Sequence, residues 1–363
     1  MIDKNIKLAA TPSGRFYLSD ATWSAQQEKI FARSWQYIGN EADFPEPDMH
    51  YPLHFMEGCL NEPLILSVQQ NGEYQLMSNV CTHRGFILLQ EKSRAGIIKC
   101  RYHGRCFEHD GKFLSMPEFE AAENFPTRMD DLAKASVENW NGLLFASLFP
   151  STTINKWLGG LMERMYFFPF DKLQFRKEYS KDYTIQANWA LYCDNYLEGF
   201  HIPFVHKSLN KVIDYHHYET VLLDHGVLQI GVAKESDPLF ELPADSPEYG
   251  KRIAAYYYWF FPNMMLNFYP WGLSMNIIRP QGKDQTTVSF LVFVCDESKY
   301  DRGAGSDLNR VEMEDEEVVE SVHRGLQSRL YHSGRYSPKM ETGVHHFHRL
   351  MMAALETNSN DRD

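Results

Sequence analysis

The chain has 363 residues, a length that suits two or three domains and allows a substantial core without disulfide bonds. Hydrophobic residues make up 44% and charged residues 23%, a composition that excludes disordered, collagen-like and coiled-coil chains. The net charge of −12 argues against nucleic acid and against anionic membrane surfaces as partners.

Two further features bear on the compartment. The six cysteines are too few for a disulfide scaffold at this length and are typical of intracellular thiols. The first residues lack the continuous apolar core of a secretory signal, and the densest apolar run, 256–266, is broken by Pro262 and Asn263. A membrane span needs about 20 apolar residues. We therefore expect a cytoplasmic protein that does not interact with a membrane.

The first part of the chain changes from a helical to a strand pattern. Apolar residues recur at helical spacing over 17–40, and the prolines of 41–53 indicate an extended link. From about residue 60, short apolar runs separated by turn signals such as Asn71-Gly72 predict paired strands. The pattern ends at Pro150, so we expect one small β-rich domain.

The second part mixes helices with longer strands. A connection over 151–180 leads to a segment, 181–200, that contains a helix. Strand-like runs follow at 221–232, 256–261, 273–279 and 286–294. Two helices then close the chain, a charged amphipathic one over 307–330 and another over 337–354.

A cysteine–histidine motif lies in the β-rich part. Cys81-Thr82-His83 and Cys100-Arg101-Tyr102-His103 each offer one thiolate and one imidazole where strand-like sequence gives way to a loop. A Cys2His2 [2Fe–2S] cluster needs two thiolates on one iron and two imidazoles on the other. Structural zinc sites usually pair the cysteines first and the histidines second, so zinc fits poorly, and coincidence is the remaining alternative. The motif predicts a [2Fe–2S] cluster.

Three neighbours of these ligands also bear on the cluster. Cys106 falls outside the repeat, and we interpret it as a supporting thiol rather than a ligand. Arg84 and Arg105 flank the ligands, either close to the anionic sulfur end of the cluster or as plain surface charges.

A second constellation lies in the segment 188–206. On a continuous helix Asp194, Glu198 and His201 would share one face. Pro203 ends or kinks such a helix, which allows His206 to swing back beside His201. Two imidazoles and one distant carboxylate make the facial triad of non-haem iron enzymes. Ordinary surface or core histidines are the alternative, which the cluster motif upstream disfavours.

The carboxylate of this triad must come from elsewhere in the chain. Candidates lie in the acidic run 312–317, where most of the acids would suit a helix N-terminus as solvated charges. The pattern does not choose among them. The other grouped histidines lack a matched second half, and we interpret them as surface or packing residues. They are His216, His217, His345, His346 and His348.

Taken together, these residues resemble the α subunits of Rieske non-haem iron oxygenases, also called ring-hydroxylating oxygenases, over essentially the whole chain. The resemblance implies an α+β fold, with a Rieske-type β domain for the [2Fe–2S] cluster and a helix-grip catalytic domain, in which a curved antiparallel sheet surrounds a long helix. The implied division is a helical segment at 1–45 that packs on the catalytic domain, a Rieske domain at 46–150 and a catalytic mononuclear iron domain at 151–363.

The resemblance also implies ligand sets and roles. The implied cluster ligands are Cys81, His83, Cys100 and His103. The implied ligands of the mononuclear Fe(II) are His201, His206 and Asp315. Glu198 would be an electron bridge from a neighbouring subunit's cluster histidine to His201, and Asn195 belongs to the same catalytic motif. Such chains form homotrimers, because the cluster and the iron of one chain are too far apart to exchange electrons.

The implied activity is that of an oxygenase component. It would use O2 and electrons from a separate NAD(P)H-dependent reductase or ferredoxin to hydroxylate, or oxidatively demethylate, a small organic substrate. Because no G-x-G-x-x-G follows a strand, the nicotinamide and flavin chemistry belongs to that partner. Hydroxylation of an aromatic ring by a dioxygenase, a Rieske ferredoxin-like electron carrier and a zinc-stabilised binding protein are the alternatives.

The detailed match is closest to the choline, carnitine and betaine monooxygenase branch, which suggests a quaternary ammonium substrate. The aromatic residues of 256–271 could build a cation–π cage for it, although ordinary strand core is the preferred interpretation. Gly199 and Ile202 stand where that branch often has cysteine, and Arg105 stands where the family usually has tryptophan.

Overall fold

The chain divides into two compact parts in the computed structural model, which describes residues 2–94, 96–207, 209–212, 218–234, 238–306 and 308–356. Unit 1 comprises residues 1–30 and 152–363, and unit 2 comprises residues 31–151. Residues 31–45 thus belong to the β-rich unit 2. Within the described ranges, no helix combines the length and the apolar character needed to cross a membrane.

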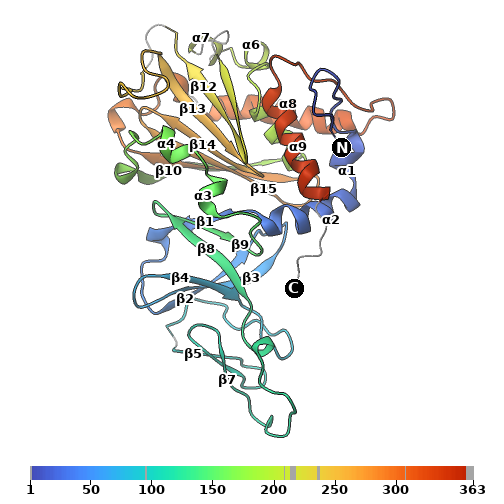
Figure 1. The fold of residues 1–363 in the computed structure, drawn as a ribbon, viewed down its shortest axis with the longest axis vertical. Helices are drawn as coiled ribbons and strands as arrows, with labels where there is room; N and C mark the ends of the chain where they lie inside the picture. Colours follow the sequence, from blue (N-terminus) through green and yellow to red (C-terminus); the bar gives the residue numbers. More distant parts are fainter. Residues whose placement is uncertain are drawn as a thin grey trace. The chain divides into compact units, whose positions relative to one another are not determined.

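Unit 2 is built from two antiparallel sheets (Figure 1). The larger sheet has the order β1 (Gln36–Asn40), β9 (Leu143–Ser147), β8 (Lys134–Trp140), β4 (Tyr74–Ser78), β3 (Glu62–Val68) and β2 (Met49–Phe55). The smaller sheet has the order β5 (Ile97–Lys99), β6 (Cys106–Glu108) and β7 (Phe113–Ser115). The short 3-10 helices are η1 (Phe31–Arg33), η2 (Glu41–Asp43) and η3 (Arg128–Asp130).

Alternation along β3 separates two hydrophobic cores. Leu64 and Leu66 face one core, which the strands of the larger sheet share. Ile65, between them, faces a second core that also contains Cys81 and Cys100. The loops that carry the predicted cluster ligands are therefore anchored on the reverse side of a central strand.

The hairpin predicted around Asn71-Gly72 is confirmed, since β3 and β4 pair from Val68 and Tyr74 onward. The helix predicted over 17–40 is wrong beyond Lys29, because residues 36–40 form β1 and pair with β9. The extended link predicted over 41–53 instead leads into β2 from Met49. In both places strand pairing overrides a local pattern.

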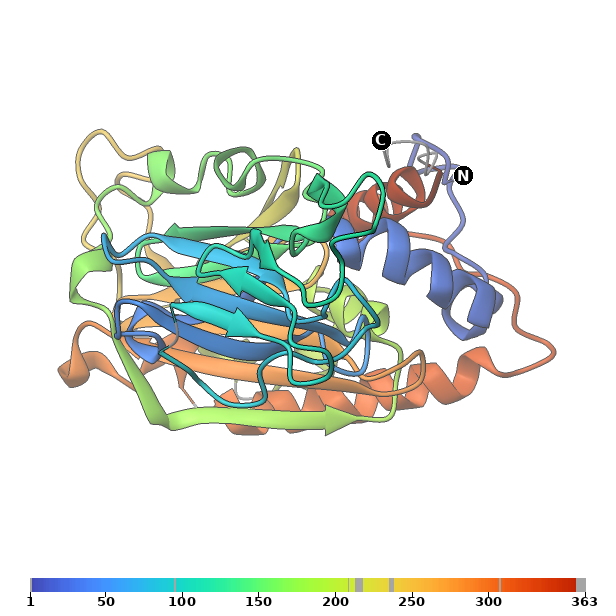
Figure 2. The ribbon, with the colours of Figure 1, turned by 90° about the horizontal axis from the view of Figure 1, so that it is seen from below.

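Unit 1 contains one antiparallel sheet of seven strands, covered by helices (Figures 1 and 2). Its order is β10 (Gln174–Ile185), β16 (Thr286–Val294), β15 (Gly272–Pro280), β14 (Met264–Tyr269), β13 (Ile253–Phe260), β12 (Gly226–Val232) and β11 (Glu219–Leu223). The helices are α1 (Gly14–Leu18), α2 (Asp20–Lys29), α3 (Ile154–Trp157), α4 (Leu161–Arg164), α5 (Trp189–Tyr196), α6 (Ile202–Val205), α7 (Leu209–Val212), α8 (Leu308–Leu326) and α9 (Thr342–Glu356), with 3-10 helices η4 (Phe170–Lys172), η6 (Glu297–Lys299) and η7 (Gly303–Gly305).

The short helix α5 is central to unit 1, because it contacts β15 as well as α8 and α9. The long helix α8 runs alongside the edge strand β10 (Figure 2). Lys181 and Tyr183 of β10 both bond to the side-chain oxygen of Asn309 on α8, at 2.6 and 2.9 Å. The α+β class and the curved sheet with its long helix are confirmed.

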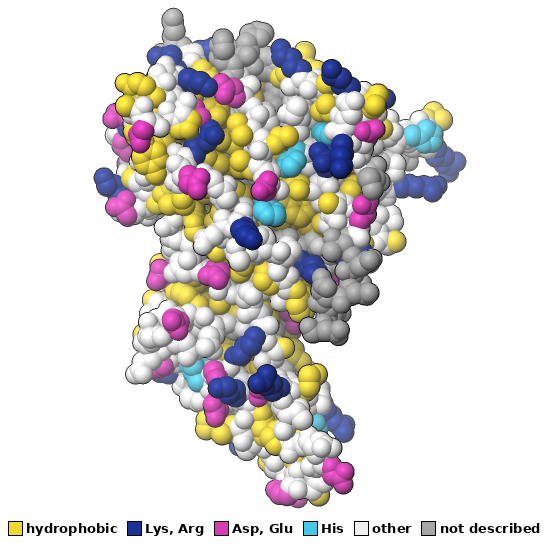
Figure 3. Space-filling model, in the orientation of Figure 1, with side chains coloured by type: hydrophobic (Ala, Val, Ile, Leu, Met, Phe, Trp, Pro, Cys, Tyr) yellow, Lys and Arg dark blue, Asp and Glu magenta, His cyan; other side chains and the backbone are white. Residues whose placement is uncertain are grey.

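Most strands of unit 1 follow the predicted pattern, and β16 has the predicted bounds. The single strand predicted over 221–232 is instead two strands, β11 and β12, with a turn at 224–225. Two strands were missed: β10 because its side chains are mostly exposed, and β14 because Pro262 and Asn263 disguise the hairpin before it. Acidic and basic side chains are interspersed over unit 1 on the face that Figure 3 draws.

Gly343, in the first turn of α9, provides a test of this packing. A Cβ there would lie 2.5 Å from the carbonyl oxygen of Leu197, the residue that follows α5. We expect Gly343→Ala to lower the free energy of unfolding by about 1–3 kcal/mol, measured by chemical denaturation. Gly325→Ala in α8 is the control, since a Cβ there meets nothing within 4 Å and alanine favours a helix. Equal effects of the two changes would contradict the packing argument.

Candidate cluster and iron sites

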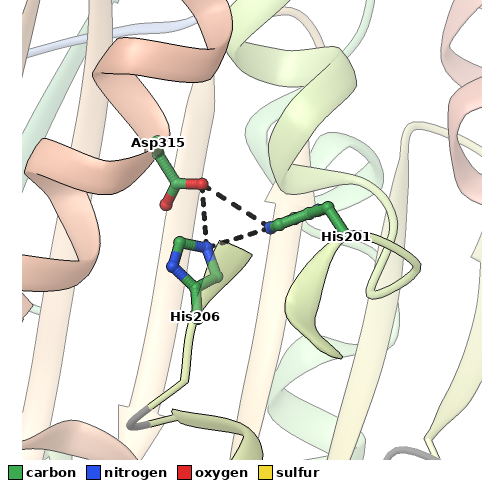
Figure 4. Close-up of side chains that lie close together, drawn as sticks. All are labelled: His201, His206 and Asp315. Atoms are coloured by element: carbon green, nitrogen blue, oxygen red, sulfur yellow. Dashed lines mark hydrogen bonds and ion pairs between the residues drawn. The ribbon is translucent and has the colours of Figure 1, made fainter. Parts of the chain in front are cut away.

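Three side chains from two distant segments converge in unit 1 (Figure 4). His201 Nε2 lies 3.1 Å from His206 Nε2, while Asp315 Oδ1 lies 3.0 Å from His206 Nε2 and 3.5 Å from His201 Nε2. Two ligand atoms that are each about 2.1 Å from one ion and at right angles lie about 3 Å apart. The triangle therefore has the size of three ligands on one face of a metal ion, with other positions left open.

Local structure brings the two histidines together. Asn188 caps α5 by accepting a hydrogen bond from the Ala190 N–H at 3.0 Å. Pro203 lies in the first turn of α6, and the His206 N–H donates to the Ile202 carbonyl at 3.0 Å. His201 and His206 thus lie just before and just after this single turn of helix.

The expectation that Asp194, Glu198 and His201 share one helix face is wrong. Helix α5 ends at Tyr196, because the Glu198 carboxylate accepts hydrogen bonds from the backbone N–H groups of Phe200 and His201 and turns the chain. Asp194 stays on α5 but contacts Tyr17 and His348, away from the triangle.

Both histidines of the triangle are fixed at their second ring nitrogen. Glu198 Oε1 lies 2.6 Å from His201 Nδ1, and Glu314 Oε2 lies 2.9 Å from His206 Nδ1. A carboxylate at Nδ1 holds the proton there and leaves the Nε2 lone pair for a metal. The donor set and its support therefore fit a resident metal ion. No sequence signal distinguished Glu314 from its acidic neighbours.

The acidic run does not form the first turn of its helix. Because α8 begins at Leu308, the run lies one turn further on, and Glu312 is only 2% exposed. Asn195 Nδ2 donates to Asp315 Oδ1 at 2.5 Å, which orients that carboxylate. The expectation that most of these acids are solvated is thus wrong for Glu312, Glu314 and Asp315, which all face the site.

A pocket of about 790 Å³, part of it open to solvent, adjoins the triangle. Its wall combines phenol rings with amides. The tyrosines are Tyr192, Tyr196, Tyr218, Tyr257 and Tyr269, and the amides are Asn195, Gln229, Asn267 and Asn276. Of the aromatic residues between 256 and 271, only Tyr257 and Tyr269 line this pocket among the described residues, and most of the rest are core.

Glu312 is the unusual member of the pocket wall. Tyr192 Oη donates to its Oε2 at 2.5 Å, whereas Oε1 is buried and has no hydrogen-bond partner among the described residues. Burial, together with the charges of Asp315 and Glu316, raises the pKa of Glu312 well above its ordinary value. A buried carboxylate with a free oxygen is costly unless a positive group joins it.

The predicted cluster ligands lie in two loops of unit 2 with the same backbone pattern. The Cys81 N–H donates to the Phe86 carbonyl and the Gly85 N–H donates back to Cys81, at 2.8 and 3.0 Å. In the second loop the Gly104 N–H donates to the Cys100 carbonyl at 3.1 Å, and the Cys100 N–H donates to the Arg105 carbonyl at 2.8 Å. Gly85 and Gly104 have φ of +70° and +76°, which glycine adopts without strain.

The side chains of these loops divide by type. The cysteines are buried, and burial raises the pKa of the Cys81 thiol, with a hydrogen bond to Cys100 adding to this effect. The rings of His83 and His103 lie with their centroids 4.8 Å apart. Two buried thiols and two more exposed imidazoles are the donor set that a Cys2His2 [2Fe–2S] cluster requires, so the loops fit that group.

The remaining sequence candidates have other environments. Arg84 is exposed, but Arg105 is buried, so the surface-charge interpretation of Arg105 is wrong. The other histidines of α9 bond within unit 1: His345 to the Asp3 carbonyl, His346 to the Leu223 carbonyl and His348 to Tyr17 and Tyr336. His216 and His217 lie outside the described residues.

Comparison with known proteins gives two family matches. Residues 170–357 match the ring hydroxylating alpha subunit (catalytic domain), and residues 34–126 match the Rieske [2Fe-2S] domain. The chain is 29% identical to the chloroplastic choline monooxygenase of Beta vulgaris, over 94% of this chain and 76% of that protein. It is 26% identical to the carnitine monooxygenase oxygenase subunit of Escherichia coli K12, over 96% and 94%.

Solved structures share the fold. The quaternary ammonium Rieske monooxygenase CntA in complex with L-carnitine has a TM-score of 0.71 at 22% identity, covering 96% of both chains. Naphthalene 1,2-dioxygenase from Rhodococcus sp. has a TM-score of 0.69 at 19% identity, covering 96% of this chain and 95% of that one. At these identities the likeness concerns the fold alone.

The support of His206 by Glu314 can be tested directly. We expect Glu314→Gln to lower the affinity for Fe(II) by about 10- to 100-fold, because His206 Nδ1 loses its carboxylate partner. Competition with a chelator measures the dissociation constant. Glu317→Gln, at an exposed position of the same helix, is the control and should leave the affinity unchanged. Equal affinities for both variants would rule out the supporting role.

Proposed function

Because the chain belongs to the family of ring-hydroxylating oxygenase α subunits, we propose that it oxidises a small quaternary ammonium compound. The protein is a Rieske non-haem iron oxygenase that carries a [2Fe–2S] cluster and a mononuclear iron. It uses O2, electrons from a separate reductase and a small organic substrate.

Glu312 carries the proposal on the substrate. Glu312 lines a pocket in which tyrosine rings outnumber other aromatic groups, and its buried Oε1 has no hydrogen-bond partner among the described residues. A quaternary ammonium group offers no hydrogen-bond donor, so it binds through its charge and through ring faces. A buried carboxylate beside several phenol rings supplies both. A neutral aromatic hydrocarbon offers Glu312 neither a charge nor a hydrogen-bond donor, so this group would add nothing to its binding, which disfavours the ring-hydroxylating alternative.

The relatives support the same chemical class. Choline and carnitine, which give the most similar relatives their names, both contain a trimethylammonium group. A Rieske ferredoxin-like electron carrier or a zinc-stabilised binding protein would not explain the triangle of His201, His206 and Asp315. Neither would explain the carboxylates behind the histidines. We therefore favour hydroxylation at a carbon of the ammonium compound, with one oxygen atom inserted, over dioxygenation.

We assign individual roles on this basis. His201, His206 and Asp315 would hold Fe(II), and the bound iron would supply the activation of O2. Asn195 orients Asp315 through its 2.5 Å hydrogen bond. Glu198 holds His201 at 2.6 Å and would be the electron bridge. Cys81, Cys100, His83 and His103 would hold the cluster.

A homotrimer is also part of the proposal. Glu198 and His201 line a second hollow in unit 1, open to solvent, besides the proposed substrate pocket. Val322 and Tyr331 line that hollow and are 44% and 40% exposed, which makes its rim partly apolar. Such a rim suits a neighbouring subunit that brings its cluster to Glu198.

Glu312→Gln tests the substrate class. We expect kcat/KM for a choline-like cation to fall by about 10- to 100-fold, because one buried charge pair is lost. The 3,3-dimethylbutyl analogue, which has the same shape without the charge, should lose little. Glu317→Gln, which removes a carboxylate from an exposed position of the same helix, is the control. An equal loss for cation and neutral analogue would contradict the proposal.

His201→Ala tests the iron assignment separately from the substrate. The variant should lose turnover and one iron per chain yet keep the visible spectrum of the cluster. Turnover that survives this change would exclude His201 as a ligand.

A further inference from the structure

Arg105, in the second cluster loop, is buried. This is unusual, because arginine side chains are rarely removed from water. It is 2% exposed and follows His103 by two residues. Its guanidinium carbon lies 5.0 Å from the centroid of the Phe113 ring and 5.4 Å from that of Phe125. The charge is therefore enclosed by aromatic rings, a setting in which solvent screens it weakly.

The polar contacts of Arg105 join the two cluster loops. Its Nη1 donates to Thr82 Oγ1 at 2.5 Å, and Thr82 lies between Cys81 and His83. The Thr82 hydroxyl in turn donates to the Asp130 carbonyl at 2.8 Å. One guanidinium thus ties the loop of the first ligand pair to the loop of the second.

A carboxylate balances the charge of this guanidinium. Arg105 Nη2 donates to Asp130 Oδ1 at 2.8 Å. Burial alone would raise the pKa of Asp130, but hydrogen bonds from Thr127 and Arg105 hold it below its ordinary value, so the carboxylate is ionised. The two guanidinium nitrogens thus have different partners, since Nη1 donates to Thr82 and Nη2 to the Asp130 carboxylate.

We propose that Arg105 is a positioning residue of the cluster site that also raises the reduction potential of the [2Fe–2S] cluster. Reduction adds one negative charge to the cluster, and a nearby, weakly screened positive charge stabilises the reduced form. The same side chain holds Thr82, and with it the backbone between Cys81 and His83. The inference rests on the proposed cluster ligands and is independent of the substrate.

Two substitutions at the ion pair should shift the potential in opposite directions. Arg105→Gln removes the positive end and leaves Asp130 uncompensated, so the potential should fall. Asp130→Asn leaves Arg105 uncompensated, so the potential should rise. A purely structural role would not produce shifts of opposite sign. Redox titration of the purified full-length protein, followed by EPR or circular dichroism, measures both without any turnover.

Arg101→Gln is the matched control, because it removes the same charge from an exposed position of the same loop. Its shift should be clearly smaller than that of Arg105→Gln. Arg105→Lys keeps the charge but not the planar fork, so the potential should stay close to that of the unchanged protein while the iron and sulfide content falls.

The outcomes separate this inference from the rest of the assignment. If the Arg105→Gln variant does not assemble a cluster, the Asp130→Asn variant still tests the proposal. A reduction potential that falls or stays unchanged in Asp130→Asn overturns it. A shift in Arg105→Gln no larger than in Arg101→Gln also overturns it. If the protein without any substitution contained no sulfide and lacked the cluster spectrum, the assignment of the cluster ligands would be refuted instead.

Discussion

Two hydrogen bonds of 2.5 Å join α5 to α8: Tyr192 donates to Glu312, and Asn195 donates to Asp315. Each pair of positions is three residues apart on its own helix, so the two bonds fix both the distance and the register of the helices. Slipping α8 by one residue would turn Asp315 away from the histidines and Glu312 away from the pocket. The iron site and the substrate wall therefore depend on the same two bonds.

This arrangement concentrates negative charge. Glu198, Glu314 and Asp315 surround two histidines, and Glu312 lies buried beside them. Like charges at such distances are unfavourable in a poorly solvated site. A divalent ion offsets Asp315 and the carboxylates behind the two histidines, whereas Glu312, which lines the pocket, is left for the proposed cationic substrate. Charge balance thus connects the metal to the substrate class.

The extent to which sequence predicts this protein follows from the distances along the chain. The proposed cluster ligands lie in two tight loops whose hydrogen bonds are local, so their spacing alone suffices to predict such a site. His201 and His206 are also local, on either side of one helical turn. Asp315 is not, because the choice within 312–317 depends on how α8 packs on α5, and only the family resemblance selected it. The pocket residues Tyr196, Tyr218 and Gln229 carry no local signal at all.

Packing behind the pocket wall bears on Gly199, which stands where the choline and carnitine monooxygenase branch often has cysteine. A Cβ at Gly199 would lie 3.2 and 3.3 Å from ring atoms of Tyr218 and 3.4 Å from the side chain of Ile202. These distances are tighter than ordinary contacts, so a larger residue at position 199 would push the Tyr218 ring. Because Tyr218 lines the substrate pocket, Gly199 acts on pocket shape without lining the pocket itself. The proposed ligands would set the chemistry of the site, whereas small residues behind the wall, such as Gly199, limit the shape of the pocket for the proposed substrate.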